Sequence, residues 1–270
     1  MSVASPGKRI VIKIGTGVLT RNAGGEIHHA MIARLSQAIA DIHTAGHEII
    51  LVSSGAVGAG LSAFGLTRRP TETEMLQACA AAGQARLMHL YESQFGLHGI
   101  KVAQLLVTHD DLQDARRSGN VLATLNAILP HRHVIPILNE NDSVSVYELK
   151  VGDNDTLSSI VARLVGADLL ILLTSVAGLM GPEARSPDDI ITEVDDIESA
   201  FAFVRDEKGT LSVGGMASKL RAVEAAVASG IETIIASGLN PEQLPELVEG
   251  RGTGTRFRAR TISSLPASAS

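Results

Sequence analysis

The chain has 270 residues, of which 45% are hydrophobic, 19% charged and 3% aromatic, and its formal net charge is -6. A chain this long and apolar can bury a large core, so disorder throughout is excluded. The acidic balance argues against nucleic-acid and anionic-membrane partners, and a single cysteine, Cys79, excludes a disulfide scaffold. The N-terminus has no apolar signal segment and no apolar run could span a bilayer, so we expect a cytoplasmic protein.

Short apolar runs alternate along the chain with longer helical stretches. The predicted strands are Arg9–Ile14, Glu48–Val52, Lys101–Val107, Val134–Leu138, Leu169–Leu173 and Glu232–Ala236. The predicted helices are His29–Ala45, Thr73–Phe95, Asn120–Leu129, Asp155–Val165 and Met216–Ser229. This alternation predicts βαβ units, and the nearly continuous apolar strands predict a mainly parallel sheet that is covered on both faces. We expect one α/β domain over residues 1–262, with a flexible tail at 263–270.

Two stretches differ from this pattern. The segment Gly181–Leu211 is charged, contains proline and includes a Lys-Gly turn, which predicts a hairpin or flap outside the main sheet. The helix Thr73–Phe95 has an Ala- and Gly-rich side, "ACAAAGQA", that allows close packing in the core or at a dimer interface.

Four glycine-containing polar segments follow predicted strands. They are "KIGTG" from Lys13, "SSGAVGAG" from Ser53, "NENDS" from Asn139 and "GGMASK" from Gly214. None matches the ordinary P-loop or the dinucleotide-binding pattern. Each could be a turn that needs glycine, but the carboxyl ends of parallel strands form the ligand crevice of such sheets, and helix starts favour anions. Four such segments together favour a site for an anionic ligand.

Two lysines stand out against their surroundings. Lys13 lies within an apolar strand, where it is either a cation aimed at phosphate or a side chain that reaches solvent from an edge strand. Lys219 falls in the first turn of a helix, a position that the helix dipole disfavours for cations, which suggests an anionic ligand unless the side chain is simply solvated.

The segment "KVGDNDTLS" is the most specific. Asp153, Asn154 and Asp155 stand together where a helix begins, and a helix needs only one such capping residue. Carboxylates near two lysines can orient them and help to hold Mg²⁺ with phosphates.

The motifs "VIKIGTGVLT", "VSSGAVGAG", "PILNENDSVS", "KVGDNDTLS", "LLLTSVAGLM" and "GGMASKLRA" together resemble the amino-acid kinase family, over about Arg9 to Arg258. "NEND" followed by "KVGDND" is particular to its glutamate-phosphorylating members. The resemblance implies a three-layer αβα sandwich and transfer of the ATP γ-phosphoryl group to the γ-carboxylate of L-glutamate, the first step of proline biosynthesis. It also implies inhibition by proline, a homo-oligomer (a dimer or tetramer), and Mg²⁺ held mainly by the nucleotide phosphates.

The resemblance assigns roles to individual residues. The implied catalytic residues are Lys13, Lys219 and Asp155, and the implied glutamate ligands are Ser54, Gly55, Asn139, Asp142 and Asn154. The implied nucleotide site comprises Lys13, Gly15, Thr174, Ser175, Val213, Gly214, Gly215, Met216, Ala217, Ser218 and Lys219. No protein side chain is implied as a resident metal ligand.

Three positions depart from the family pattern, all in the nucleotide half. Ser175 replaces the usual aspartate, Met180 replaces a tyrosine, and the turn that usually begins Gly-Thr-Gly-Gly-Met has Ser212 and Val213 before its Gly-Gly-Met. Many bacterial members also carry a C-terminal PUA domain, which we do not expect here. Two alternatives to the glutamate reading are a kinase of another small carboxylate or phosphate acceptor, and a nucleotide-binding sensor without activity.

Overall fold

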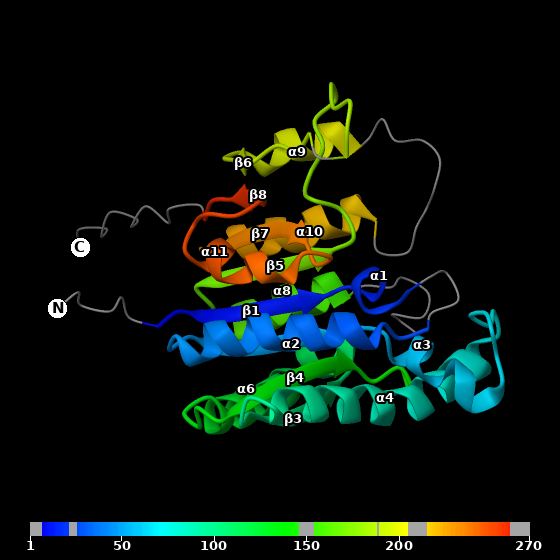
Figure 1. Cartoon of the computed structure of the whole chain (residues 1–270). Helices are drawn as coiled ribbons and strands as arrows, with labels where there is room; N and C mark the ends of the chain where they lie inside the picture. Colours follow the sequence, from blue (N-terminus) through cyan, green and yellow to red (C-terminus); the bar gives the residue numbers. More distant parts are fainter. Residues whose placement is uncertain (1–6, 22–25, 146–153, 188, 205–214, 260–270) are drawn as a thin grey trace.

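The structure is a computed structural model of the whole chain (Figure 1). It describes residues 7–21, 26–145, 154–187, 189–204 and 215–259. In this part of the chain, no helix is long and apolar enough to cross a membrane.

A central sheet of eight strands organises the fold, in the order β3-β4-β2-β1-β5-β7-β8-β6. The strands are β1 (Arg9–Ile14), β2 (Glu48–Ser53), β3 (Lys101–Val107), β4 (Val134–Glu140), β5 (Leu169–Thr174), β6 (Glu193–Val194), β7 (Glu232–Ser237) and β8 (Gly254–Phe257). Every pairing is parallel except that of β7 with β8, which is antiparallel. The prediction of a mainly parallel sheet is therefore confirmed.

Helices lie on both faces of this sheet, with α2 and α4 on the front and α8 and α10 behind it in Figure 1. The α-helices are α1 (Thr16–Leu19), α2 (His29–Thr44), α3 (Ala56–Gly60), α4 (Thr73–Gly96), α5 (His109–Gln113), α6 (Ala115–Ile128), α8 (Asn154–Val165), α9 (Ile197–Val204), α10 (Met216–Val227) and α11 (Leu244–Val248). Two 3₁₀ turns, η1 (Leu61–Phe64) and η2 (Pro241–Gln243), complete the set. The three-layer αβα sandwich is thereby confirmed.

Two hydrophobic cores explain the continuous apolar strands. Ile10, Ile12 and Ile14 of β1 join the core that includes α2 and α4, whereas Val11 joins the core that includes α8 and α10. Successive side chains of a strand point to opposite faces, so a strand between two helical layers is apolar at every position. Lys13 breaks this rule within β1, where a buried charge needs a partner.

The sequence prediction was wrong for the segment after β5. Glu193–Val194 forms β6, which pairs with β8 at one edge of the main sheet, and Ile197–Val204 forms a helix instead of a hairpin arm. The expected Lys-Gly turn lies outside the described residues. The strand Gly254–Phe257 was not predicted either, because "GTRF" is too short to show a period.

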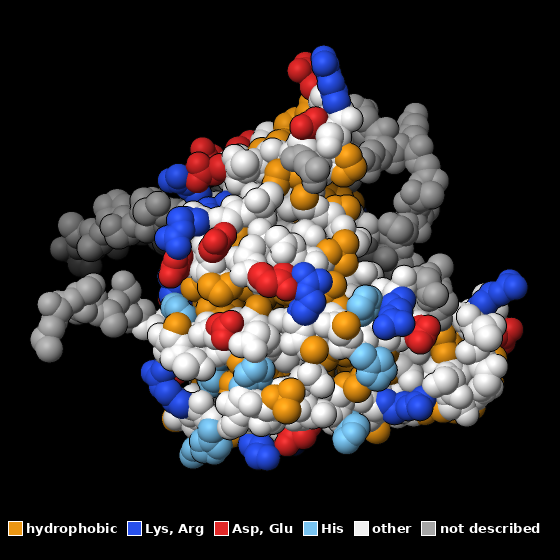
Figure 2. Space-filling model, viewed as in Figure 1, with side chains coloured by type: hydrophobic (Ala, Val, Ile, Leu, Met, Phe, Trp, Pro, Cys, Tyr) orange, Lys and Arg blue, Asp and Glu red, His pale blue; other side chains and the backbone are white. Residues whose placement is uncertain are grey.

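Charged side chains of both signs are mixed on the face shown in Figure 2. Among the described residues on that face, lysine and arginine do not gather into the basic patch that nucleic-acid binding needs.

Candidate active site

Three side chains meet where β1, α8 and α10 come together. Lys13 Nζ lies 2.7 Å from Asp155 Oδ1, and Lys219 Nζ lies 3.0 Å from Asp155 Oδ2. All three residues are buried, with relative exposures of 6%, 1% and 7% in the order Lys13, Asp155, Lys219. Lys13 therefore does not reach solvent from an edge strand, because β1 is hydrogen-bonded to β2 and β5, and Lys219 is not a solvated surface lysine.

The two lysines keep the carboxylate between them charged. Burial by itself raises the pKa of Asp155, but the nearby charges and hydrogen bonds of Lys13 and Lys219 outweigh burial and hold that pKa below its usual value. This cluster carries two positive charges and one negative charge. The cluster therefore gives an acidic protein a local net positive charge that can attract a small anion.

The residue before Asp155 anchors a second part of the site. Asn154 Nδ2 donates to Ser53 O at 3.0 Å, to Ser54 Oγ at 2.8 Å and to Asn139 Oδ1 at 3.1 Å. Neither Asn154 nor Asp155 therefore serves only as a helix cap, as the simpler interpretation held. Asp153 lies outside the described residues.

Asp142 is the most perturbed carboxyl group in this part of the site. It is 7% exposed, and its Oδ1 atom is buried with no hydrogen-bond partner among the described residues. Burial and the nearby carboxylate of Glu140 raise the pKa of Asp142 to about 7, against the opposing charge of Arg69. A buried acceptor without a partner favours a ligand with a donor, and an ammonium group also supplies the missing positive charge.

A cavity of about 300 Å³ opens beside Asp142. Its lining residues are Ala56, Ala80, Ala81, Gln84, Ala85, Gln104, Leu106, Glu140, Asn141, Asp142 and Ser143. Glu140 and Gln84 were not among the sequence-predicted site residues. The signal for Glu140 was the motif "NEND" itself, and Gln84 was the one amide within "AAAGQA".

Backbone geometry brings Ser54 and Gly55 to this site. The Ser54 amide donates to Ile14 O at 3.2 Å, which fixes the end of β2 beside the end of β1. Gly55 has φ +98° at the N-cap of α3, a backbone conformation that residues with a side chain rarely adopt. The glycine therefore lets the chain turn from β2 directly into α3.

The Ala- and Gly-rich side of α4 packs on α3. A Cβ atom at Gly83 would lie 1.8 Å from Ala56 O, and one at Gly60 would lie 1.8 Å from Cys79 O. Cys79 is fully buried in this contact, as expected for a core residue. Of the two readings of this helix side, the structure supports the core.

The described residues of the predicted nucleotide site lie at the ends of β1 and β5 and at the start of α10. Thr174 is buried at the end of β5, Ser175 is exposed next to it, and a Cβ atom built on Gly15 would lie 3.4 Å from Lys13 Nζ. Gly215 is the N-cap of α10, so Met216, Ala217, Ser218 and Lys219 form its first turn. Val213 and Gly214 lie outside the described residues.

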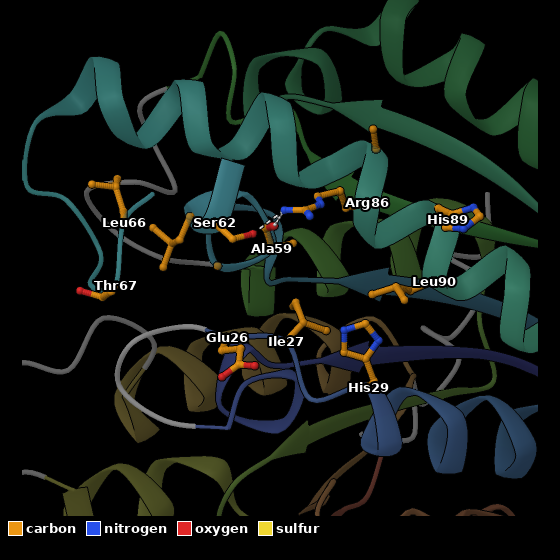
Figure 3. Close-up of a pocket in the computed structure, with 13 residues that line it drawn as sticks. Glu26, Ile27, His29, Ala59, Ser62, Leu66, Thr67, Arg86, His89 and Leu90 are labelled. Carbon is orange, nitrogen blue, oxygen red and sulfur yellow. Dashed lines mark hydrogen bonds between the residues drawn. The ribbon is translucent and has the colours of Figure 1, made fainter. Parts of the chain in front are cut away.

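A second cavity, of about 800 Å³, lies between α2, α4 and the α3–η1 segment (Figure 3). His29 of α2 faces His89 and Leu90 of α4 across it, and Arg86 is hydrogen-bonded to Ser62 at its upper wall in that view. None of the lysines or carboxylates of the cluster lines this cavity. It is therefore separate from that cluster, although Ala85 lines both this cavity and the one beside Asp142.

Comparison with known proteins identifies the family of the chain. The model of the amino acid kinase family matches residues 8–237. The chain belongs to the amino acid kinase family. It is 46% identical over 252 residues to the glutamate 5-kinase of Acinetobacter baylyi, covering 93% of this chain but only 66% of that protein. It is 40% identical over 259 residues to the glutamate 5-kinase of Salmonella paratyphi B, covering 95% of this chain and 70% of that protein.

A solved structure with the same fold is the carbamate kinase from Giardia lamblia bound to AMP-PNP. It superposes with a TM-score of 0.65 at 19% identity and covers 94% of this chain and 99% of its own. At this identity the likeness supports the fold alone.

Proposed function

We propose that the protein transfers the γ-phosphoryl group of ATP to the γ-carboxylate of L-glutamate. The observation that carries this proposal is the buried Lys13–Asp155–Lys219 cluster, next to a cavity whose buried Asp142 lacks a donor. The similarity to glutamate 5-kinases supports L-glutamate as the acceptor, although the chain spans only about two thirds of the length of those relatives.

The chemistry needs charge neutralisation more than a strong base. A γ-carboxylate oxygen of glutamate attacks the γ-phosphorus, the bond from that phosphorus to the bridging oxygen of ADP breaks, and γ-glutamyl phosphate and ADP result. A carboxylate is already a nucleophile at neutral pH, so positioning and stabilisation of the phosphoryl charge supply the rate. Lys13 and Lys219 supply that positive charge, and Asp155 holds both ammonium groups in place.

We propose that Mg²⁺ enters with ATP and is held mainly by the phosphates. Within the described residues there is no cluster of three or more His, Cys, Asp or Glu side chains that could hold a metal ion. Asp155 also has a lysine against each of its oxygens, so it is engaged in orienting these cations. The ion would reduce the charge repulsion between ATP and the incoming carboxylate.

The acceptor site fits a small amino acid. A cavity of about 300 Å³ lies at the lower end of the range for small-molecule pockets. Asp142 faces the α-ammonium group in this proposal, and the Asn154 amide fixes Ser54 and Asn139 around the acceptor.

The test is a coupled assay in which hydroxylamine traps the acyl phosphate as a hydroxamate. Hydroxamate that forms only with both ATP and L-glutamate would support the proposal. Folded protein that gives no glutamate-dependent product but phosphorylates another carboxylate would overturn the choice of acceptor. Binding of ATP without any turnover would instead indicate a sensor.

We also propose that proline inhibits the enzyme by occupying the acceptor cavity, since proline has the same α-ammonium and α-carboxylate groups as glutamate. The larger cavity of Figure 3 offers no buried carboxylate without a partner among its described lining residues. Inhibition that is competitive with L-glutamate and weakened by Asp142→Asn would support this assignment. Inhibition that is insensitive to glutamate concentration would place proline elsewhere.

We propose a homo-oligomer, a dimer or tetramer, that works in the cytoplasm. The strand β3 lies at one edge of the sheet and exposes Leu106, which leaves an edge that a second copy could cover. Light scattering on the purified chain tests this assembly, and a monomer at all concentrations would contradict it.

A further inference from the structure

Gln84 is the polar side chain that α4 presents to the acceptor cavity. The other α4 residues in its lining, Ala80, Ala81 and Ala85, carry only methyl groups. Gln84 is 8% exposed and its Oε1 accepts from Asn139 Nδ2 at 2.9 Å. A long, buried amide among alanines is costly unless both ends of its amide are used.

Backbone groups determine which end of this amide faces the cavity. Asn139 Oδ1 accepts from the backbone N–H of Glu140 at 2.9 Å, and a backbone N–H can only donate. Asn139 must therefore turn its Nδ2 toward Gln84, and Gln84 must accept this hydrogen bond with Oε1. The remaining polar group of the Gln84 side chain is its Nε2 amide, which is a hydrogen-bond donor.

A second fixed amide lies on the same network. Asn154 directs Nδ2 to Ser53 O, a carbonyl that can only accept, so its orientation is fixed as well. Within the part of the chain that the structure describes, its Oδ1 atom is buried without a hydrogen-bond partner, like Oδ1 of Asp142. The cavity thus combines the Asp142 acceptor, which suits an ammonium group, with a side-chain donor from Gln84 on the α4 wall.

We propose that Gln84 is a substrate-contacting residue whose Nε2 donates to the α-carboxylate of the acceptor amino acid, while Asp142 faces the α-ammonium. This inference rests on the proposed function and specifies how the same site selects an α-amino acid. A neutral donor suits this wall because a lysine or arginine there would pair with Glu140 or Asp142 instead of with the ligand.

The experiment compares three single variants of the full chain in the hydroxamate assay. Gln84→Leu removes both ends of the amide. Gln84→Glu keeps an oxygen for Asn139 Nδ2 but has no N–H to offer. Gln94→Leu makes the same chemical change on the same helix at a residue that does not line the cavity, and it is the control.

We expect KM for L-glutamate to rise roughly tenfold in both Gln84 variants, as for loss of one hydrogen bond to a charged group, with KM for ATP unchanged. The control should keep both constants. The competing ligand 4-aminobutyrate, which is glutamate without its α-carboxylate, should show the same inhibition constant in the wild-type protein and in Gln84→Leu.

A wild-type KM for L-glutamate in Gln84→Glu would overturn the inference, because it would show that Gln84 only supports Asn139. Equal weakening of L-glutamate and 4-aminobutyrate in Gln84→Leu would overturn it too. Wild-type protein without glutamate-dependent turnover would instead overturn the proposed function, and this inference with it. The wild-type and variant measurements thus separate the two failures.

Discussion

Asn154 and Asp155 are consecutive residues whose side chains bind different halves of the site. Asn154 bonds to Ser54 and Asn139 on the side that we propose for the acceptor, whereas Asp155 holds Lys13 and Lys219 on the side that we propose for the phosphoryl group. Adjacent residues of a helix point about 100° apart, so one helix start can serve two partners at once. The first turn of α8 therefore ties the position of the acceptor to that of the two cations.

The first prediction concerns the lysine pair. Asp155→Asn removes the charge that orients Lys13 and Lys219, so we expect kcat to fall by roughly 10²- to 10³-fold, as for other losses of preorganised electrostatic groups. Steady-state kinetics with both substrates measures this loss. Asp168→Asn changes a carboxyl group at the opposite end of β1, where Asp168 accepts from the Arg9 amide, and should leave kcat unchanged. A similar loss in both variants would contradict a specific role for Asp155.

The second prediction concerns the pH dependence of acceptor binding. The pKa of Asp142 is raised to about 7, so the group is protonated in half of the molecules near neutral pH. Only the carboxylate attracts an ammonium group, so KM for L-glutamate should fall as pH rises from 6 to 8, by roughly tenfold at most. Asp142→Asn should abolish this trend while raising KM. If Asp142→Asn kept the pH dependence of KM seen in the wild-type protein, a group other than Asp142 would be responsible for it.

The third prediction concerns stability without ligand. Because the pKa of Asp142 is higher in the folded chain than the usual value near 4, the folded state retains this proton longer than the unfolded state does. The stabilisation is complete below about pH 4 and is lost as pH rises through 7, by an amount on the order of 4 kcal/mol.

The measurement is the free energy of unfolding by urea between pH 5 and 8, for the wild-type chain and for Asp142→Asn. The decrease with pH should be smaller in Asp142→Asn. L-glutamate should restore stability most strongly above pH 7. Curves that run parallel across this range would show that Asp142 is not the group responsible.

The fourth prediction concerns the contact of α3 with α4. Gly83→Ala would place a methyl group 1.8 Å from Ala56 O, so α3 must move, at a cost of about 1–3 kcal/mol or more. Because α3 begins directly after Ser54 and Gly55, KM for L-glutamate should rise as well.

The same helix supplies the control. Gly96→Ala is at the end of α4, where nothing lies within 4 Å of the added methyl group, and it should be neutral or slightly stabilising. Thermal unfolding of both variants distinguishes them. Equal stability of Gly83→Ala and Gly96→Ala would mean that α3 is not held as tightly as the structure indicates.

Local patterns in the amino-acid sequence are enough to predict the central strands and to single out the two lysines. Strands such as Leu169–Thr174 are buried on both faces, so their continuous apolar runs can be recognised from the sequence alone. Lys13 stood out for the same reason, because a charge in such a run needs a partner. The short strand Gly254–Phe257 gave no such signal, since its place is set by pairing with β7.

The packing of segments that are distant in the sequence determines which polar groups meet. Gln84 and Asn139 are 55 residues apart, and Asn154 and Ser54 are 100 residues apart, so no local pattern could pair them. The raised pKa of Asp142 likewise depends on burial and on Glu140, which are properties of packing. Composition and periodicity record what each segment needs locally, whereas hydrogen-bond partners and desolvation arise only when separate segments come together.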